Sequence, residues 1–402
     1  MNIQDLINQA KSALENEIEA VRKKPSTDIL FDGERIKSDG GGKGRDYKFE
    51  THHSSIRYAE EIKAKTKEKE FVVKPVFYEN NEIVLQFPEA VGEKIDELHV
   101  EWENDFVLKR MLSEIEILTD ASEVKFNRID YLFNPEPKQK AAQANIKHDG
   151  LRNSAQEQAI QKALAQRTLF IWGPPGTGKT DTLGYINANY LSMGKNVLFV
   201  SNTNRAVDIG LLSTIHALRQ IGEEELVKSS TRFGEAALDQ AGIQSFLFDE
   251  HIQKKIEKKK EQAADWINLL RKQQDLKERI EMRLRDGKQP TNNQELELKL
   301  VDQKIKNAGG QEALEELISE HSSINEAMEL RKFRFVATTL AKVCTSDLFH
   351  NMEFDAVVID EGSMANLPYL MVMASRARRH IVVVGDPMQL PPISVTDDRE
   401  SR

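Results

Sequence analysis

One stretch of the sequence combines glycines, a lysine and a threonine at a spacing that binds phosphate groups. The pattern G-x-x-x-x-G-K-[ST] is matched at every fixed position by eight consecutive residues: Gly173, Pro174, Pro175, Gly176, Thr177, Gly178, Lys179 and Thr180. Glycines let successive backbone N–H groups approach a phosphate, and the start of a helix adds partial positive charge. We expect Lys179 to reach the β and γ phosphates of ATP and Thr180 to place its hydroxyl on Mg²⁺. A glycine turn that binds nothing is the alternative, which the apolar run before the loop disfavours.

Two carboxylates and one amide follow apolar runs later in the chain. Asp360 and Glu361 come directly after residues 357–359, which have the composition of a buried strand. We expect Asp360 to hold Mg²⁺ through water and Glu361 to polarise an attacking water, with a surface turn as the alternative. Gln389 stands among prolines that fix the backbone, so its amide would project from a strand end and sense the γ-phosphate.

The elements that must position these groups form an alternating pattern of apolar strands and helices. The predicted strands are residues 168–172, 196–201, 333–338, 354–359 and 380–385. Continuous apolar strands separated by helices predict an α/β fold, in which helices cover both faces of a parallel sheet. Ligands bind at the carboxyl ends of such strands, so the phosphate loop, the two acids and Gln389 should meet there. This domain is predicted to span residues 151–402.

A charged, helix-rich segment interrupts the alternation at residues 235–331. Apolar residues recur at helical spacing in a first arm and again in a second arm, where the set is Leu314, Leu317, His321, Ile324 and Met328. With a turn near residues 286–293, this predicts an antiparallel helical hairpin on the order of 50 Å long, broken in its return arm by Gly309 and Gly310. Lysines between residues 254 and 260 are interleaved with glutamates, which favours a solvated face over a nucleic-acid site.

The part of the chain before residue 135 is predicted to form a helix and then a small β-rich domain. Residues 5–21 carry apolar side chains at helical spacing and a glycine-rich flexible loop follows at 38–45, which together give an N-terminal segment over residues 1–45. Residues 46–135 contain a helix and four predicted strands, which are 47–51, 70–78, 82–87 and 98–102. We expect these strands to close into a small barrel or half-barrel, which would either bind a strand of nucleic acid or serve as a packing platform. A proline-rich boundary at 134–137 separates it from the next domain.

Composition limits the classes of function. The 402 residues are 30% charged and 39% hydrophobic, and no stretch approaches the roughly 20 apolar residues needed to cross a bilayer. The N-terminus also lacks a secretory signal pattern, so we expect a cytoplasmic protein with no membrane partner. A net charge of −9 means that a nucleic acid would need a local groove. Cys344 is the sole cysteine and is expected to be a small core residue.

Further motifs extend these observations into a resemblance to a known family. Residues 385–392 fit the third motif of superfamily 1 helicases, Gly-Asp-x-x-Gln-Leu-Pro-Pro. The acidic pair and the two residues after it are similar to the second motif, Asp-Glu-Ala-Ser, with Gly362 in place of the usual alanine. Residues 153–160 resemble the motif that reads adenine, with Gln156 in the reading position. Residues 201–208 are similar to the segment that touches the nucleic-acid backbone in the branch containing the nonsense-mediated-decay helicase.

This resemblance implies a RecA-like P-loop NTPase that uses ATP and Mg²⁺ to move along single-stranded DNA or RNA. It implies that Asn202 and Thr203 contact nucleic-acid phosphates, although Asn202, Thr203 or Asn204 could also cap a helix. It also implies that Thr338 and Thr339 contact the nucleic-acid backbone from a later segment. The resemblance covers residues 151–393 apart from the helical insertion, and the strand-rich module more weakly resembles the barrel of this branch. Because the chain ends soon after the third motif, without a second RecA-like domain, we expect an amino-terminal portion of a helicase or a natural short form that needs a partner. Hydrolysis by the chain alone should then be weak, because the arginines that act from across the nucleotide cleft are missing.

Two other functions stay open. A coiled coil between the phosphate loop and the acidic motif also occurs in structural ATPases of the chromosome-maintenance type, although the sequence contains no Leu-Ser-Gly-Gly motif. In the other alternative, the chain is an ATP-gated binding module whose helical hairpin grips another protein. Hydrolysis stimulated by single strands would favour the helicase over the binding module, whereas nucleotide-driven dimerisation would favour the structural ATPase.

Overall fold

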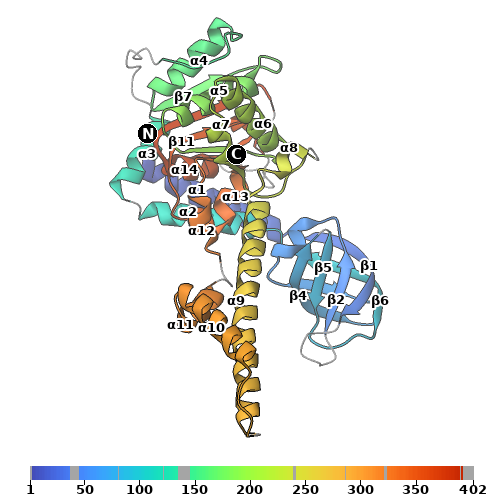
Figure 1. Cartoon of the computed structure of the whole chain (residues 1–402). Helices are drawn as coiled ribbons and strands as arrows, with labels where there is room; N and C mark the ends of the chain where they lie inside the picture. Colours follow the sequence, from blue (N-terminus) through green and yellow to red (C-terminus); the bar gives the residue numbers. More distant parts are fainter. Residues whose placement is uncertain are drawn as a thin grey trace.

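The computed structural model describes residues 2–36, 45–79, 81–120, 122–134, 145–238, 241–285, 287–320, 324–389 and 391–392. Figure 1 shows three parts: a domain of helices around a central sheet, a barrel of strands, and a long helix that projects from the sheet domain. Most of the predicted flexible loop at 38–45 and of the predicted boundary at 134–137 lies outside the described residues, as do His321 and Leu390.

The central sheet has six parallel strands in the order β7-β12-β11-β8-β10-β9. In chain order they are β7 (Thr168–Trp172), β8 (Val197–Ser201), β9 (Ser230–Arg232), β10 (Phe335–Thr339), β11 (Phe354–Ile359) and β12 (Ala377–Gly385). Five of the six correspond to predicted strands, and the predicted parallel sheet is confirmed. The three-residue β9 was not predicted, because so short a strand shows no apolar pattern.

Helices cover both faces of this sheet. One face packs against α4 (Ser154–Ala165), α5 (Lys179–Ser192), α6 (Asn204–Gln220) and α7 (Glu224–Lys228). The other face packs against α3 (Glu123–Phe133), α13 (Leu340–Thr345) and α14 (Leu367–Arg376), and α1 (Ile3–Arg22) and α2 (Phe106–Thr119) pack against these helices and belong to the same core. Alternate residues of a strand serve the two cores: Leu198 and Val200 of β8 belong to one, and Val197 and Phe199 to the other. Burial on both faces therefore explains why the strands are continuously apolar.

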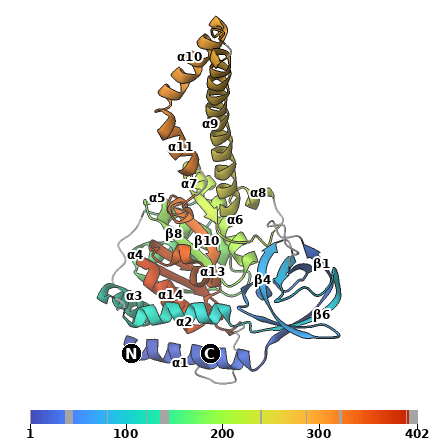
Figure 2. The ribbon, with the colours of Figure 1, turned by 90° about the horizontal axis from the view of Figure 1, so that it is seen from below.

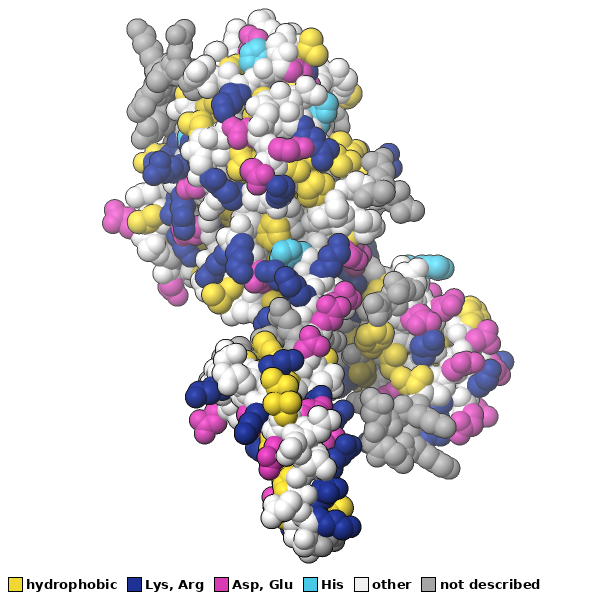
Figure 3. Space-filling view, viewed as in Figure 1, with side chains coloured by type: hydrophobic (Ala, Val, Ile, Leu, Met, Phe, Trp, Pro, Cys, Tyr) yellow, Lys and Arg dark blue, Asp and Glu magenta, His cyan; other side chains and the backbone are white. Residues whose placement is uncertain are grey.

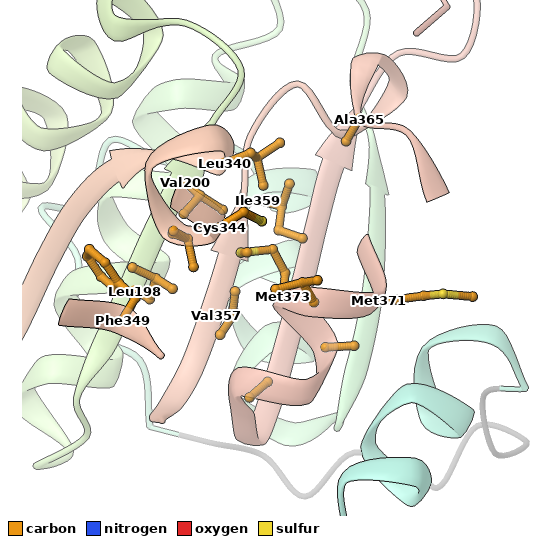
Figure 4. Close-up of a cluster of buried hydrophobic side chains, with 14 of the residues drawn as sticks. Leu198, Val200, Leu340, Cys344, Phe349, Val357, Ile359, Ala365, Met371 and Met373 are labelled. Atoms are coloured by element: carbon orange, nitrogen blue, oxygen red, sulfur yellow. The ribbon is translucent and has the colours of Figure 1, made fainter. Parts of the chain in front are cut away.

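Cys344 lies in the core on the second of these faces. In the cluster drawn in Figure 4, it lies among side chains of β8, β11, α13 and α14, including Val200, Ile359 and Met373. Burial raises the pKa of the Cys344 thiol, so the thiol stays neutral and packs as a small apolar group. The predicted core role of this cysteine is confirmed.

Six antiparallel strands close into a barrel in the order β1-β2-β5-β4-β3-β6. In chain order they are β1 (Ser26–Ile36), β2 (Asp46–Glu50), β3 (Ile62–Lys65), β4 (Glu70–Glu79), β5 (Glu82–Gln86) and β6 (Lys94–Trp102). Large rings fill the interior, and Tyr47, Phe49, Phe87 and Trp102 are all buried. Tyr47 and Phe87 meet edge to face with ring centres 5.0 Å apart. Of the two predicted forms, a barrel and a half-barrel, the structure confirms the barrel.

Two strands of the barrel, β1 and β3, were not predicted. Acidic residues and a glycine interrupt the apolar residues of β1, and β3 has only four residues, so neither shows a clear alternation. Gly33 is needed in β1 because a Cβ there would lie 2.1 Å from the ring of Phe49. Pairing of β1 with β6 places residues 26–36 in the barrel, whereas the sequence suggested a helix and a loop before residue 45.

Two helices connect the barrel to the sheet domain. The chain leaves α1 into β1 and returns from β6 into α2, and the two helices lie side by side below the sheet domain in Figure 2. The predicted helix at residues 5–21 is confirmed as α1. Glu114 of α2 forms a largely buried ion pair with Arg376 of α14 at 2.5 Å, and Arg128 of α3 pairs with Glu353 at 2.8 Å. These pairs fix α2, and α3 that follows it, to the sheet domain.

The segment between β9 and β10 is helical and contains α8 (Ala241–Gln244), α9 (Phe248–Arg285), α10 (Asn292–Asn307), α11 (Gln311–Glu320) and α12 (Glu326–Leu330). The 38 residues of α9 extend over roughly 57 Å. α10 runs back along α9 in Figure 1, and side chains join the two helices, with Lys272 contacting Glu297 at 2.7 Å and Gln273 contacting Asp302 at 2.6 Å. The two predicted glycines adopt left-handed conformations between α10 and α11 and break the return arm. Neither α9 nor any other described helix combines the length and apolar character needed to cross a membrane.

The base of this hairpin is held by a largely buried carboxylate, that of Glu329 in α12. It contacts His251 and Lys255 of α9, and Lys332 just beyond α12. Burial opposes ionisation, but hydrogen bonds from the two lysines outweigh it and lower the pKa of Glu329 to about 2. Lys255, which belongs to the lysine-rich run noted in the sequence, therefore has a structural partner.

Candidate active site

The phosphate-binding pattern forms the loop between β7 and α5. Gly176 and Gly178 both have a φ of 76°, in the left-handed region that residues with a Cβ rarely adopt. A Cβ on Gly178 would also lie 2.6 Å from the side-chain amide of Gln156. The hydroxyl of Thr177 donates to the carbonyl of Pro174 at 2.8 Å and closes the loop. Strand, loop and helix thus follow in the order that a phosphate-binding loop requires.

The first turn of α5 offers backbone N–H groups to a ligand, because Gly178 precedes the helix and has no side chain to cap it. Lys179 and Thr180 lie in this turn, and both are half-buried. The ammonium group of Lys179 donates to the carbonyl of Gly173 at 2.5 Å, so the side chain lies folded across the loop. A phosphate oxygen could take the place of that carbonyl as the acceptor.

Gln156 lies against the loop from α4. It forms a capping box with Asn153, whose N–H donates to the side chain of Gln156 at 3.1 Å. The amide nitrogen of Gln156 donates to the carbonyl of Thr177 at 3.4 Å. A cavity of about 580 Å³ opens here, and its lining includes Gln156, Trp172, Thr177 and Lys179. Its volume is in the range of small-molecule sites, which suits a nucleotide.

The acidic pair lies where β11 ends. The N–H of Asp360 donates to the carbonyl of Val200 at 2.8 Å, and its side chain is buried. Burial and the charge of Glu361 raise the pKa of Asp360 to about 6, although the charge of Lys179 acts in the opposite direction. A bound cation would offset this unfavourable burial. Among the described residues, no three histidine, cysteine or acidic side chains are placed to hold a metal ion together. Mg²⁺ typically takes only one or two carboxylates together with substrate phosphates.

Gln389 lies beyond β12 and is held by Asp386. Its amide donates to the carboxylate of Asp386 at 3.0 Å, and the same carboxylate accepts from the indole of Trp172 at 3.0 Å. The hydrogen bond from Gln389 is the main cause that lowers the pKa of Asp386, and the charge of Lys179 contributes. Asp386 thus joins Gln389 to the end of β7. Asp386 belongs to the third helicase motif at residues 385–392. Its partner Trp172 lies on another strand, so this contact could not be predicted from the sequence.

These groups meet at one edge of the sheet, formed by the carboxyl ends of β7, β11 and β12. Lys179 is close enough to influence the pKa of both Asp360 and Asp386. The structure therefore brings the phosphate loop, the acidic pair and Gln389 into one site. A loop of N–H groups, a cation and two carboxylates at one sheet edge can bind a triphosphate with a hard metal ion.

Comparison with known proteins assigns the family. Residues 152–397 match the family AAA_11, described as an AAA domain and of superfamily 1 helicase type, and the match covers more than half of the chain. The chain belongs to this family. The resemblance to superfamily 1 helicases is thereby confirmed, and the AAA_11 domain contains the whole site described above.

Two relatives of this AAA_11 protein are helicases. An uncharacterised ATP-dependent helicase of Methanocaldococcus jannaschii is 24% identical over 317 residues, which are 74% of this chain and 46% of that protein. Helicase Sen1 of Schizosaccharomyces pombe is 23% identical over 285 residues, which are 60% of this chain and 17% of that protein. The matched region thus spans less than half the length of either relative.

One residue of this AAA_11 domain departs from the helicase pattern. Gly362 stands where the second motif usually has alanine. A Cβ at this position would lie 2.4 Å from Cγ1 of Val383, so glycine lets the turn after β11 pack closely on β12. Alanine would require this part of the AAA_11 domain to shift.

The residues predicted to contact nucleic acid lie at the carboxyl ends of β8 and β10, which are neighbours in the AAA_11 sheet. Asn202 and Thr203 follow β8, and Thr338 and Thr339 are the last two residues of β10. Thr203 is exposed and caps α6. Thr338 is fully buried and donates to a backbone carbonyl at 2.9 Å, while Thr339 is buried and caps α13. Asn202 is half-buried, and its amide donates to the carbonyl of Glu361 at 3.0 Å. Of the four, only Thr203 presents an exposed side chain.

A buried ion pair next to residues 202–204 of the AAA_11 domain was not predicted from the sequence. Arg232 of β9 and Asp208 of α6 are fully buried, with Nε 2.8 Å from Oδ1. Arg232 also donates to the side chain of Asn204 at 2.9 Å, and the carboxylate of Asp208 accepts from the N–H groups of residues 237 and 238 at 2.6 and 3.0 Å. The pair fixes the start of α6 to the start of the helical insertion. Arg232 was missed because β9 was not predicted.

Proposed function

We propose that this chain binds ATP with Mg²⁺, hydrolyses it, and couples hydrolysis to movement along a single strand of DNA or RNA. The observation that carries the proposal is the meeting of the phosphate loop, the acidic pair and Gln389 at one sheet edge, beside a cavity of about 580 Å³. Gln156 borders this cavity and would read adenine. Membership of a family of superfamily 1 helicase type supports the same activity.

Each residue of the site has a role that its position supports. Lys179 would bind the β and γ phosphates, and Thr180 and Asp360 would hold Mg²⁺. Mg²⁺, when bound, neutralises charge on the phosphates. Glu361 would polarise the attacking water, and Gln389 would sense the γ-phosphate. We also propose that hydrolysis by the chain alone is weak and rises when an arginine is supplied from across the nucleotide cleft.

A nucleic-acid strand would run over the ends of β8 and β10, where Thr203 is exposed and Thr338 and Thr339 lie beneath. Figure 3 shows lysines and arginines interleaved with acidic side chains over one face of the molecule. Binding would therefore depend on contacts within a groove and would weaken with added salt. The cytoplasmic location expected from the sequence stays part of this proposal.

A second function is favoured by the surface of the hairpin. Leu296 and Leu300 are each 58% exposed and lie one turn apart on α10, whereas Leu298, Val301 and Ile305 belong to the cluster against α9. We propose that this side of α10 contacts a protein, which an ATP-gated binding module would also require. Replacing both exposed leucines with glutamine should abolish that complex without changing ATP affinity. The family match favours the helicase over a structural ATPase of the chromosome-maintenance type.

The direct test of the site compares nucleotide binding by the unaltered chain and by Lys179→Ala. We expect at least tenfold weaker affinity for a fluorescent ATP analogue with Mg²⁺, because the variant loses charge-assisted bonds to phosphate. The matched control is Lys228→Ala, which removes an exposed lysine paired with Glu225 and should leave the affinity unchanged. Equal affinities for the unaltered chain and Lys179→Ala would reject the site. Stimulation of hydrolysis by a single-stranded oligonucleotide then tests the translocase.

A further inference from the structure

Three consecutive side chains after β8 lie in three different surroundings. Asn204 accepts a hydrogen bond from Arg232, and Thr203 caps α6 and is exposed. Asn202 reaches the turn after β11, where its amide nitrogen donates to the backbone carbonyl of Glu361 at 3.0 Å. β8 and β11 are neighbours in the sheet, so Asn202 connects the end of one strand with the acid that follows the next.

Glu361 has an unfavourable backbone conformation, which contacts with neighbouring residues must stabilise. Its φ is 54° and its ψ is 37°, in the left-handed region that is unfavourable for residues with a Cβ. The N–H of Glu361 donates to the carboxylate of Asp360 at 2.9 Å, and its carbonyl accepts from the N–H of Met364 at 3.0 Å. These two bonds lie within the turn, whereas the bond from Asn202 comes from a different strand and ties the turn to β8.

We propose that Asn202 is a positioning residue that fixes the orientation of Glu361 for ATP hydrolysis. This inference rests on the proposed function, in which Glu361 polarises the attacking water. The direction of a side chain depends on the φ and ψ of its own residue, so a turn that relaxes would carry the carboxylate away from the phosphates. A nucleic-acid strand bound over the exposed Thr203 would act on the same segment, and through Asn202 on the rate of hydrolysis.

The sequence suggested a different role for Asn202, in which its side chain binds a nucleic-acid phosphate. The two roles differ in the donor that they use, because the N–H that bonds to Glu361 cannot serve a phosphate at the same time and leaves only the second N–H of the amide for that purpose. They also predict different results when Asn202 is replaced. Loss of a positioning residue lowers the rate and leaves strand affinity nearly unchanged, whereas loss of a phosphate ligand lowers strand affinity.

The test compares Asn202→Ala with the matched control Asn204→Ala, two residues away. Four quantities are measured on the full chain: the single-turnover rate of ATP hydrolysis, the affinity for a fluorescent ATP analogue, the affinity for a labelled oligothymidylate, and hydrogen exchange at the Met364 amide. Asn202→Ala should lower the hydrolysis rate at least tenfold, keep both affinities within threefold, and speed the exchange at Met364. Asn204→Ala should leave the rate and this exchange within twofold of the unaltered chain, because its side chain faces Arg232.

Two outcomes would overturn the inference. In one, Asn202→Ala weakens oligothymidylate binding and leaves hydrolysis unchanged, which identifies a phosphate ligand. In the other, neither the rate nor the exchange at Met364 changes. If the unaltered chain fails to bind ATP, the proposed function is wrong, and hydrogen exchange still tests the contact itself. Asn202→Asp keeps the size of the side chain but places a carboxylate against a carbonyl, so it should repeat the loss if Asn202→Ala fails to fold.

Discussion

Removing Asp208 should destabilise the sheet domain strongly, because it leaves the charge of Arg232 buried without the carboxylate that balances it. Both side chains are fully buried, and their closest nitrogen and oxygen atoms are 2.8 Å apart. Breaking a buried ion pair by removing one partner costs about 3–5 kcal/mol. Asp208→Ala also frees the N–H groups of residues 237 and 238, which lie 2.6 and 3.0 Å from the carboxylate. We therefore expect a loss in the upper part of that range, about 4–5 kcal/mol.

Urea denaturation followed by circular dichroism measures this loss. The double variant Asp208→Leu/Arg232→Met removes both charges and should be more stable than Asp208→Leu alone. The control is Glu225→Ala, which removes an exposed pair with Lys228 and should change the free energy of unfolding by less than about 0.5 kcal/mol. A loss below about 1 kcal/mol for Asp208→Ala would refute the reasoning. A double variant that is no more stable than Asp208→Leu would do the same.

Three further changes test other parts of the structure. The pKa of Glu329 is lowered to about 2, so its ionised side chain stabilises the fold above about pH 4.5, and this stabilisation is lost as the pH falls towards 2. Glu329→Gln should therefore flatten the pH dependence of the thermal unfolding temperature between about pH 4.5 and pH 2. Gly33→Ala should destabilise the barrel by about 1–3 kcal/mol in urea unfolding, because its Cβ would overlap the ring of Phe49. Gly178→Ala should weaken ATP binding at least tenfold by titration calorimetry, because its φ of 76° and a side-chain amide from α4 both oppose a Cβ.

Sequence patterns predicted the fold best where both sides of a strand are buried. Strands β8, β10, β11 and β12 are apolar over successive residues because helices cover both faces of the sheet, and each was predicted. β1 has one face towards water, and acidic residues and Gly33 interrupt its alternation of apolar and polar residues. Glycine is required at position 33 because the ring of Phe49, from another strand, fills the space of a Cβ. Such a strand can be identified only from its partners.

The candidate site shows the same division between local and distant information. The phosphate loop and the acidic pair are short motifs, so their chemistry could be predicted from residue type and spacing. The contacts that hold the site together join residues 24 to 214 positions apart and leave no trace in local spacing. These contacts are Asp208–Arg232, Asn202–Glu361 and Trp172–Asp386.

Contacts around Glu235 join the barrel, the helical insertion and the sheet domain. Arg57 of the barrel lies against two tyrosine rings and contacts Glu235, at the start of the insertion, at 3.0 Å. The backbone carbonyl of Glu235 accepts from Arg232 at 2.6 Å, and Arg232 is bound to Asp208 of α6. A displacement of the barrel or of the hairpin base would therefore shift the start of α6, which lies two residues from Asn202. Arg57 and Glu235 are joined by a single ion pair, so one substitution there can interrupt the route, and its effect on hydrolysis can be measured separately from ATP binding.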